Sequence, residues 1–166
     1  KHIDWRIKGA VGYVKDQVFC GSCWTFAAAG MLESRMNIMQ MKESPNAPKI
    51  SLSEQSIVDC FWDDHEADPF LRSSGCEGGQ QDYAIKWFKD EMNSNFALEE
   101  DYPYLGQNDY CKQEKFTFNK YKISKVCKVP MNDVDQLKQA LQSGPVSVTI
   151  DVPESLTFYV SGIYND

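Results

Sequence analysis

Gln17-Val-Phe-Cys20-Gly-Ser-Cys23-Trp24 is the stretch that decides the fold, and it places a glutamine six residues before a cysteine. Two cysteines separated by two residues can form half of a zinc site or a redox pair. A zinc site needs further ligands, such as a second Cys-x-x-Cys or a pair of histidines, and the sequence offers neither. The metal and redox interpretations are therefore disfavoured.

A long helix is predicted to begin at Cys23. Residues 23–41 carry apolar side chains around much of the helical circumference, so we expect this helix to be largely buried. The apolar positions in question are Ala27, Ala28, Met31, Leu32, Ile38 and Met39. The thiolate is the reactive form of cysteine, and its charge is favoured at a helix N-terminus by unpaired N–H groups and the positive end of the dipole. The predicted position of Cys23 therefore suits nucleophilic chemistry.

Composition limits the class of protein. The chain has 166 residues, a formal charge of −7 and 42% hydrophobic residues, which are values of a globular protein. It has no run of five basic residues and no apolar run of spanning length, so neither nucleic acid nor a membrane is expected as a partner. Its six cysteines favour an oxidising compartment such as a lysosome, a vacuole or the extracellular space.

The rest of the first two thirds reads as loops and short helices. Two prolines predict a loop over residues 42–50, and Ser53 is a good N-cap for a short helix that begins with an acidic residue. Residues 61–75 are predicted to form an acidic surface loop, and Gly75-Cys-Glu-Gly-Gly79 a tight turn. Helical spacing then joins Ile85, Phe88 and Met92 on the next helix.

The last third has a different character. An extended segment is predicted over residues 122–130, followed by a short helix capped by Asn132 or Asp133 and stopped at Gly144-Pro145. Val146 to Val152 alternate apolar and polar residues, which predicts a half-buried strand. Helices followed by strands favour either two sub-domains or an α+β arrangement. Because one or two strands make no stable closed sheet, we expect a second polypeptide, or residues past Asp166, to complete it.

Cys20-Gly-Ser-Cys23-Trp24 has the form C-G-[SA]-C-[WY] and resembles the nucleophile signature of papain-family cysteine proteases. Further segments stand in the order of that family: Leu52-Ser-Glu-Gln55, Asp59-Cys60, Tyr102-Pro-Tyr104, Gly144-Pro-Val146 and Gly162-Ile-Tyr164. Asp4-Trp-Arg6 near the start is similar to a mature N-terminus left after propeptide removal from a zymogen. The resemblance therefore covers almost the whole chain.

The resemblance implies an α+β, papain-like fold. Residues 8–112 would form a helical left domain that includes the nucleophile helix. Residues 1–7 and 113–166 would form part of an antiparallel β-barrel, the right domain, completed by residues outside this chain. The active-site cleft would lie between the two domains.

The resemblance also implies roles for individual residues. Cys23 would be the nucleophile, and Gln17 would donate from its side-chain amide to the oxyanion together with the Cys23 backbone N–H. Substrate would be bound by Gly78, Gly79 and Trp24. Thr149, with Gln80 and Gln81, would border the S2 pocket, where these polar side chains argue against a strict preference for large apolar P2 residues. No cofactor or metal is required.

Disulfide pairing is likewise implied by the resemblance. Cys20 would pair with Cys76, and Cys60 with Cys111. Cys23 then remains as the free thiol, and Cys127 is interpreted as a buried free thiol rather than half of a bridge to residues outside this chain.

The catalytic histidine of the family is missing from this sequence. It is expected about 130–150 residues after the nucleophile. Only 143 residues follow Cys23, and two expanded loops place the expected position just past the end. His2 precedes the signature, and His65 lies in the acidic stretch 63–68, which we interpret as a solvated face rather than a metal site. Histidine and asparagine are therefore expected from outside this chain.

Three explanations remain open. The first is a two-chain enzyme similar to cathepsin C (dipeptidyl peptidase I), whose light chain brings both residues. Gly30-Met-Leu-Glu33 followed by Arg35 resembles that subgroup. Two features depart from it: the tyrosine expected a few residues beyond Gly79 is out of register, at Tyr83, and an extra cysteine pair is absent. The second is that the sequence simply ends before the histidine. The third is a truncated, catalytically inactive relative with a structural or binding role.

Overall fold

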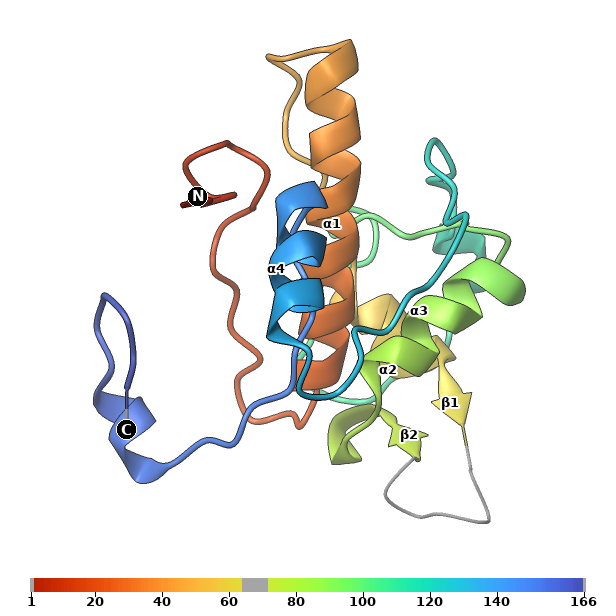
Figure 1. Cartoon of the computed structure of the whole chain (residues 1–166). Coiled ribbons are helices and arrows are strands. Elements are labelled where there is room, and N and C mark those ends of the chain that lie inside the picture. The colour runs from red at the N-terminus through yellow and green to blue at the C-terminus, as the bar shows by residue number, and fades with distance from the viewer. Residues whose placement is uncertain (1, 64–71, 166) are drawn as a thin grey trace.

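The computed structural model describes residues 2–63 and 72–165 and is built around one central helix, α1 (Cys23–Glu43) (Figure 1). The predicted helix over residues 23–41 is confirmed and continues to Glu43. Ala28 and Leu32 are buried as expected, but Met39 is 45% exposed because it lies on the wall of an open cavity. The buried part of α1 also carries the polar side chains of Thr25, Glu33, Ser34 and Asn37.

Two further helices pack on α1 and close a helical core, which falls in the predicted left domain. α2 (Glu54–Cys60) begins at the predicted N-cap, since the Ser56 N–H donates to Ser53 Oγ at 2.9 Å. α3 (Gln81–Asp90) buries Ile85 and Phe88, whereas Met92 lies just past its end and packs on the core from there. Full burial of an aromatic side chain such as Phe88 contributes roughly 1.5–3 kcal/mol, so this apolar contact is what holds α3 in place.

A short hairpin stands at the edge of this domain. β1 (Trp62–Asp63) pairs antiparallel with β2 (Ser73–Ser74), with Trp62 opposite Ser74. These strands bound the acidic loop, and its residues 64–71, which include His65, lie outside the described residues. A 3₁₀ turn, η2 (Gly75–Glu77), then takes the place of the predicted glycine-rich turn.

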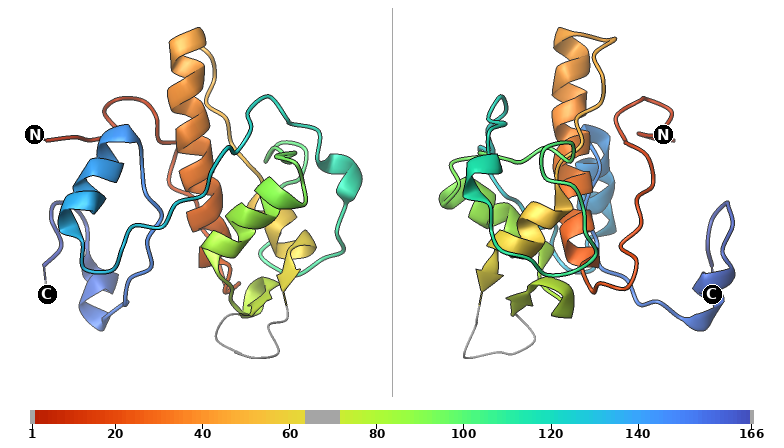
Figure 2. Two further views of the ribbon diagram at one scale, coloured as in Figure 1. Left: turned by 45° about the vertical axis from the view of Figure 1, so that its right-hand side comes forward. Right: turned by 180° about the vertical axis from the view of Figure 1, so that it is seen from behind.

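The last third contains η3 (Gln113–Lys115), α4 (Val134–Ser143) and η4 (Glu154–Phe158). Asp133 is the cap of α4, since its Oδ1 accepts from the Gln136 N–H at 2.8 Å, and the helix stops at Gly144 as predicted. Figure 2 shows α4 alongside α1 but standing apart from it, with the chain beyond α4 leading away from the helices. Trp5 Nε1 donates to the Leu141 carbonyl at 2.8 Å, which joins the N-terminal segment to α4. This bond favours the predicted grouping of residues 1–7 with residues 113–166 in one domain, separate from residues 8–112. That division stays a prediction.

The predicted strand over residues 146–152 is wrong. Val148, Ile150 and Val152 are 59%, 61% and 70% exposed, and the segment has no strand partner among the described residues. A strand needs a hydrogen-bonded neighbour, so apolar alternation alone leaves this segment extended but unpaired. Residues 122–130, predicted to be extended, also form no helix or strand. The right domain is thus incomplete in the part of the chain that the structure describes.

Candidate active site

Cys23 is the first residue of α1, and its thiol is free and exposed. The residue before it, Ser22, is fully buried, and its carbonyl accepts from the Thr25 N–H at 2.8 Å as the helix begins. The nucleophile candidate therefore stands at a fixed helix start with its sulfur open to solvent.

One disulfide ties this helix start to the glycine segment. Cys20 and Cys76 are bonded, and the Gly21 N–H donates to the Cys76 carbonyl at 2.8 Å. Any side chain at Gly21 would run into that carbonyl. Residues 76–79 are thereby held beside the Cys20–Cys23 turn.

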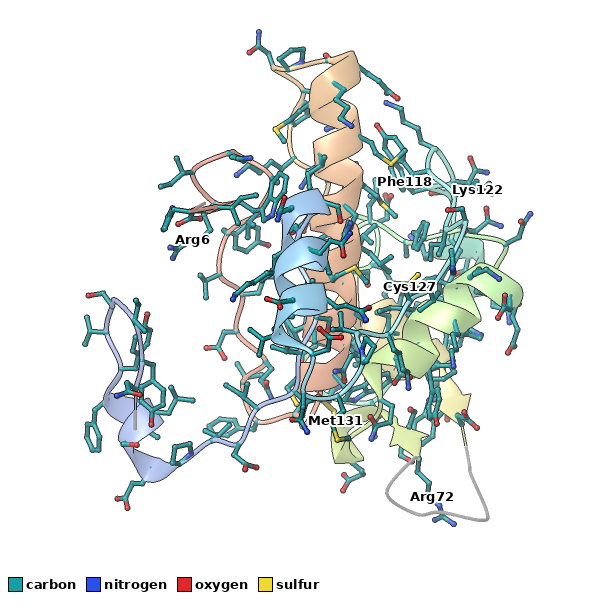
Figure 3. All side chains as sticks on the ribbon, viewed as in Figure 1. Arg6, Arg72, Phe118, Lys122, Cys127 and Met131 are labelled. Atoms are coloured by element: carbon teal, nitrogen blue, oxygen red, sulfur yellow. A yellow bond between two sulfur atoms is a disulfide. The ribbon has the colours of Figure 1, made fainter. Side chains whose placement is uncertain are left out.

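The second disulfide, Cys60 to Cys111, fixes the end of α2 to the 102–112 segment. Both bridges have the pairing that the family resemblance implies. Cys127 is free but exposed, so the expectation that it is buried is wrong. It lies in the 121–133 segment that runs between α3 and α4 (Figure 3), where no described element covers it.

Gln17 forms a closed turn with Cys20. Its Nε2 donates to the Cys20 carbonyl at 2.8 Å, and its carbonyl accepts from the Cys20 N–H at 3.3 Å. An amide NH₂ has two protons, so this bond leaves a second donor for an oxyanion. Inside the turn Val18 has φ +49°, which is a strained conformation for a β-branched residue.

The glycine segment is shaped by Trp24. A Cβ at Gly79 would lie 2.5 Å from Trp24 Cε2, so only glycine fits against the indole. Gly78 has φ +113° with open space around it, and thus requires glycine for its backbone alone. Trp24 is 2% exposed and donates from Nε1 to the Gly75 carbonyl at 3.1 Å. The expectation that Trp24 contacts substrate is therefore wrong for its side chain, which supports Gly79 from below.

Gln81 and Thr149, both expected to border S2, lie in contact, and their role in S2 stays a prediction. Gln81 Nε2 donates to Thr149 Oγ1 at 2.9 Å, although the two residues are 68 positions apart. Gln80 instead binds back to the hairpin through its N–H, which donates to Ser73 Oγ at 3.2 Å. Gln81 and Thr149 also line a cavity of about 990 Å³ between α1, α3 and α4, and Cys23 is not on its wall.

A buried charge cluster joins Lys15 to α1 and α2. Lys15 Nζ donates to Glu33 Oε1 at 2.7 Å and to Glu54 Oε1 at 2.6 Å, and Glu33 Oε1 also accepts from the Leu52 N–H. Burial raises the pKa of Glu54 to about 7, against the opposing effect of Lys15. Burial lowers the pKa of Lys15, but the two carboxylates outweigh it and raise that pKa overall.

Sequence reasoning missed this cluster and also missed Tyr104. In the sequence, Glu54 is recognisable only as an acid in the first turn of a helix, and no pattern marks Lys15. The Tyr104 hydroxyl contacts both Ser22 Oγ, at 2.6 Å, and the Gln17 carbonyl, at 3.0 Å. Its presence in the Tyr102-Pro-Tyr104 segment was the only available signal.

Metal-binding clusters are absent, and histidine is rare, in the described part of the chain. Within residues 2–63 and 72–165 there is no cluster of three His, Cys, Asp or Glu side chains able to hold a metal ion. His2 is the one histidine in these ranges, and it is exposed. None of the described helices is both long and apolar enough to cross a membrane.

Comparison with known proteins places this geometry in a family. The family model described as "Papain family cysteine protease" matches residues 1–166. The "Cathepsin L-like peptidase" of Aedes aegypti is 39% identical over 168 residues, covering 98% of this chain and 44% of that protein. "Procathepsin L" of Rattus norvegicus is 38% identical over 168 residues, covering 99% of this chain and 45% of that protein.

Solved structures agree. The bromelain protease from Ananas comosus, in complex with the E64 inhibitor, superposes with a TM-score of 0.77 and 31% identity, over 98% of this chain and 66% of that one. The chain spans less than half the length of the two curated relatives. Both are cathepsin L-like by name, and the similarity to cathepsin C stays a prediction. The family model, the curated relatives and the solved structure agree, and this chain belongs to the papain family of cysteine proteases.

Proposed function

We propose that this chain is the nucleophile-bearing part of a papain-like cysteine peptidase that hydrolyses peptide bonds. The observation that carries the proposal is the state of Cys23. Four of the other five cysteines are in disulfides, whereas Cys23 is free, exposed and at the first position of α1. It is also six residues after Gln17, whose amide has a second proton to donate.

In the proposed reaction the Cys23 sulfur attacks the carbonyl carbon of the scissile peptide bond. The resulting oxyanion is bound by the Gln17 side-chain amide and the Cys23 backbone N–H, donors of the kind that stabilise a tetrahedral intermediate. The C–N bond then breaks, the amine leaves with a proton, and a thioester remains. Water hydrolyses the thioester, which releases the acid and restores the thiol.

The residues that move protons in this scheme come from outside residues 1–166. A histidine takes the thiol proton and returns it to the leaving amine, and an asparagine orients that histidine. Both would arrive with the rest of the right domain, carried by a second chain or by further residues of the same polypeptide. The apolar side of α4 supports this, because none of its residues is buried and Val134 is 59% exposed beside the cavity.

Substrate would lie along Gly78 and Gly79 as an extended peptide. Glycine suits this role because no Cβ obstructs the approach of the peptide backbone. Gln81 and Thr149 would border S2 and accept polar P2 residues, since their hydrogen bond presents amide and hydroxyl groups there. The two disulfides favour a lysosomal, vacuolar or secreted location.

The test uses the full native protein and two matched cysteine variants. Cys23→Ala should abolish hydrolysis of peptide substrates, whereas Cys127→Ala, which removes the other free and exposed thiol, should leave it unchanged. Alkylation by iodoacetamide should inactivate the wild type and the Cys127→Ala variant alike. Peptidase activity that survives in Cys23→Ala would overturn the proposal.

The same preparation separates the remaining alternatives. Mass spectrometry of the native protein identifies any second chain and any histidine within it. Release of dipeptides only from free N-termini would identify a cathepsin C-like exopeptidase. A Cys23 that resists alkylation at neutral pH, with no histidine supplied by any partner, would identify an inactive structural component.

A further inference from the structure

The Tyr104 hydroxyl adds a side-chain link between two adjoining turns of the candidate active site, which also meet at the Cys20 carbonyl through the Gln17 side chain and the Ser22 N–H. It donates to the Gln17 carbonyl at 3.0 Å and lies 2.6 Å from Ser22 Oγ. A tyrosine hydroxyl has one proton and the carbonyl only accepts, so the Ser22 hydroxyl must donate to Tyr104. The hydroxyl therefore bridges the turn that carries the oxyanion glutamine and the residue that begins the nucleophile helix.

Tyr104 is itself firmly held. Its N–H donates to Glu99 Oε1 at 2.9 Å, and the next N–H, of Leu105, donates to Gln55 Oε1 at 2.8 Å. Its ring packs edge-on against Phe26 of α1, with centroids 4.9 Å apart. Burial raises the pKa of the Tyr104 hydroxyl, which keeps it a neutral donor.

The Gln17 turn needs such support. Val18 has φ +49°, and a strained residue of this kind costs about 1–3 kcal/mol and persists only where its surroundings hold it. The segment after Tyr104 also meets this turn, because a Cβ at Gly106 would lie 2.5 Å from Val18 Cγ2. Residues 104–106 thus contact the turn at the Gln17 carbonyl and at the side chain of Val18, whose backbone is strained.

We infer that Tyr104 is a positioning residue of the peptidase reaction: through its hydroxyl it fixes the Gln17 turn relative to Ser22, and so sets where the oxyanion donor stands with respect to the Cys23 sulfur. This rests on the proposed function. Because the oxyanion forms only during the reaction, a shifted donor should lower kcat and leave KM nearly unchanged.

The test is Tyr104→Phe in the full protein, which keeps the ring and removes only the hydroxyl. We expect kcat to fall roughly tenfold with KM within about twofold of wild type, since misplacing a donor costs less than the roughly hundredfold or greater loss on removing it. In a Gln17→Ala background the same change should cost less than about twofold, because the donor is already gone. Tyr110→Phe, on a tyrosine that is 88% exposed, is the matched control and should change neither constant.

A second readout does not depend on turnover. Hydrogen–deuterium exchange of the backbone amides of residues 18–20 should be faster in Tyr104→Phe and unchanged in Tyr110→Phe. If Tyr104→Phe does not fold, Ser22→Ala breaks the other bond of the bridge and should lower kcat by a smaller factor, about two- to threefold.

The outcomes are distinct. An active wild type whose kcat and exchange rates are unaltered by Tyr104→Phe overturns the inference and leaves the proposed function intact. A tenfold loss that persists in the Gln17→Ala background also overturns it, because Tyr104 would then act elsewhere. A wild type without Cys23-dependent activity overturns the proposed function and the catalytic role of Tyr104 together.

Discussion

Lys15 Nζ lies 2.6 Å from Glu54 Oε1, and the Glu54 side chain at the start of α2 is only 1% exposed. The same ammonium binds Glu33 at 2.7 Å, so one buried cation serves two buried carboxylates. Glu54 Oε2 has no hydrogen-bond partner among the described residues. A cluster with more negative than positive groups, and with one oxygen unsatisfied, should be sensitive both to loss of the cation and to pH.

Lys15→Met tests the first sensitivity. It keeps the length of the side chain and removes the charge, which leaves Glu33 and Glu54 buried without compensation. We expect the free energy of unfolding at pH 7.5 to fall by about 3–5 kcal/mol, as is usual when one partner of a buried pair is removed. Urea denaturation of the full protein measures it, with the exposed Lys138→Met as the control. Equal losses in the two variants would contradict the ion-pair account.

Glu54→Gln tests the second sensitivity. Burial raises the Glu54 pKa from its ordinary 4.5 to about 7 in the folded protein. A raised folded-state pKa means that this group's contribution is fully present below about pH 4.5 and is lost as the pH rises through about 7. The wild type should therefore lose on the order of 2 kcal/mol between pH 5 and pH 7.5 from this group, and Glu54→Gln should lose much less.

The measurement is urea denaturation at both pH values, with the exposed Glu100→Gln as control. A pH dependence that is the same in wild type and Glu54→Gln would assign the effect to other groups. Stability that favours mildly acidic pH also fits the proposed lysosomal or vacuolar location.

Gly79→Ala tests the support of the glycine segment by Trp24. Its Cβ would meet Trp24 Cε2 at 2.5 Å, and the indole is locked by its bond to the Gly75 carbonyl. Overpacking of this kind costs about 1–3 kcal/mol. Gly30→Ala is the matched control, because it lies inside α1 with nothing within 4 Å of its Cβ and should gain up to about 1 kcal/mol. Thermal unfolding of the two variants should therefore shift in opposite directions.

The sequence predicted those features that depend on local chemistry. Helix α1, the Ser53 and Asp133 caps and the stop at Gly144 follow from propensity and capping rules that act within a few residues. The family order of motifs supplied the disulfide pairing and the Cys23–Gln17 arrangement. The helix, the caps and the stop join neighbours in sequence, whereas the disulfide partners are 56 and 51 residues apart and were implied only by the family resemblance.

What the sequence did not predict depends on distant partners. The alternation at 146–152 is real, but a strand also needs a neighbour, and none pairs with it in the described ranges. Cys127 is exposed where a buried thiol was expected, and the Trp24 side chain expected to contact substrate is buried, because local sequence does not show which element covers a side chain. Lys15, Glu33 and Glu54 come from three separate segments, so no spacing rule could join them.

Ser53→Ala and Asp133→Ala compare a buried helix cap with an exposed one. Ser53 is 1% exposed; its Oγ accepts from the Ser56 N–H at 2.9 Å and donates to the Tyr102 carbonyl at 2.6 Å. Its removal leaves both groups buried without that partner and should cost about 2 kcal/mol or more. Asp133 caps α4 where water can replace it, so its loss should cost about 1 kcal/mol or less. Equal shifts in urea midpoint, at unchanged m, would mean that burial adds nothing to the cap at α2.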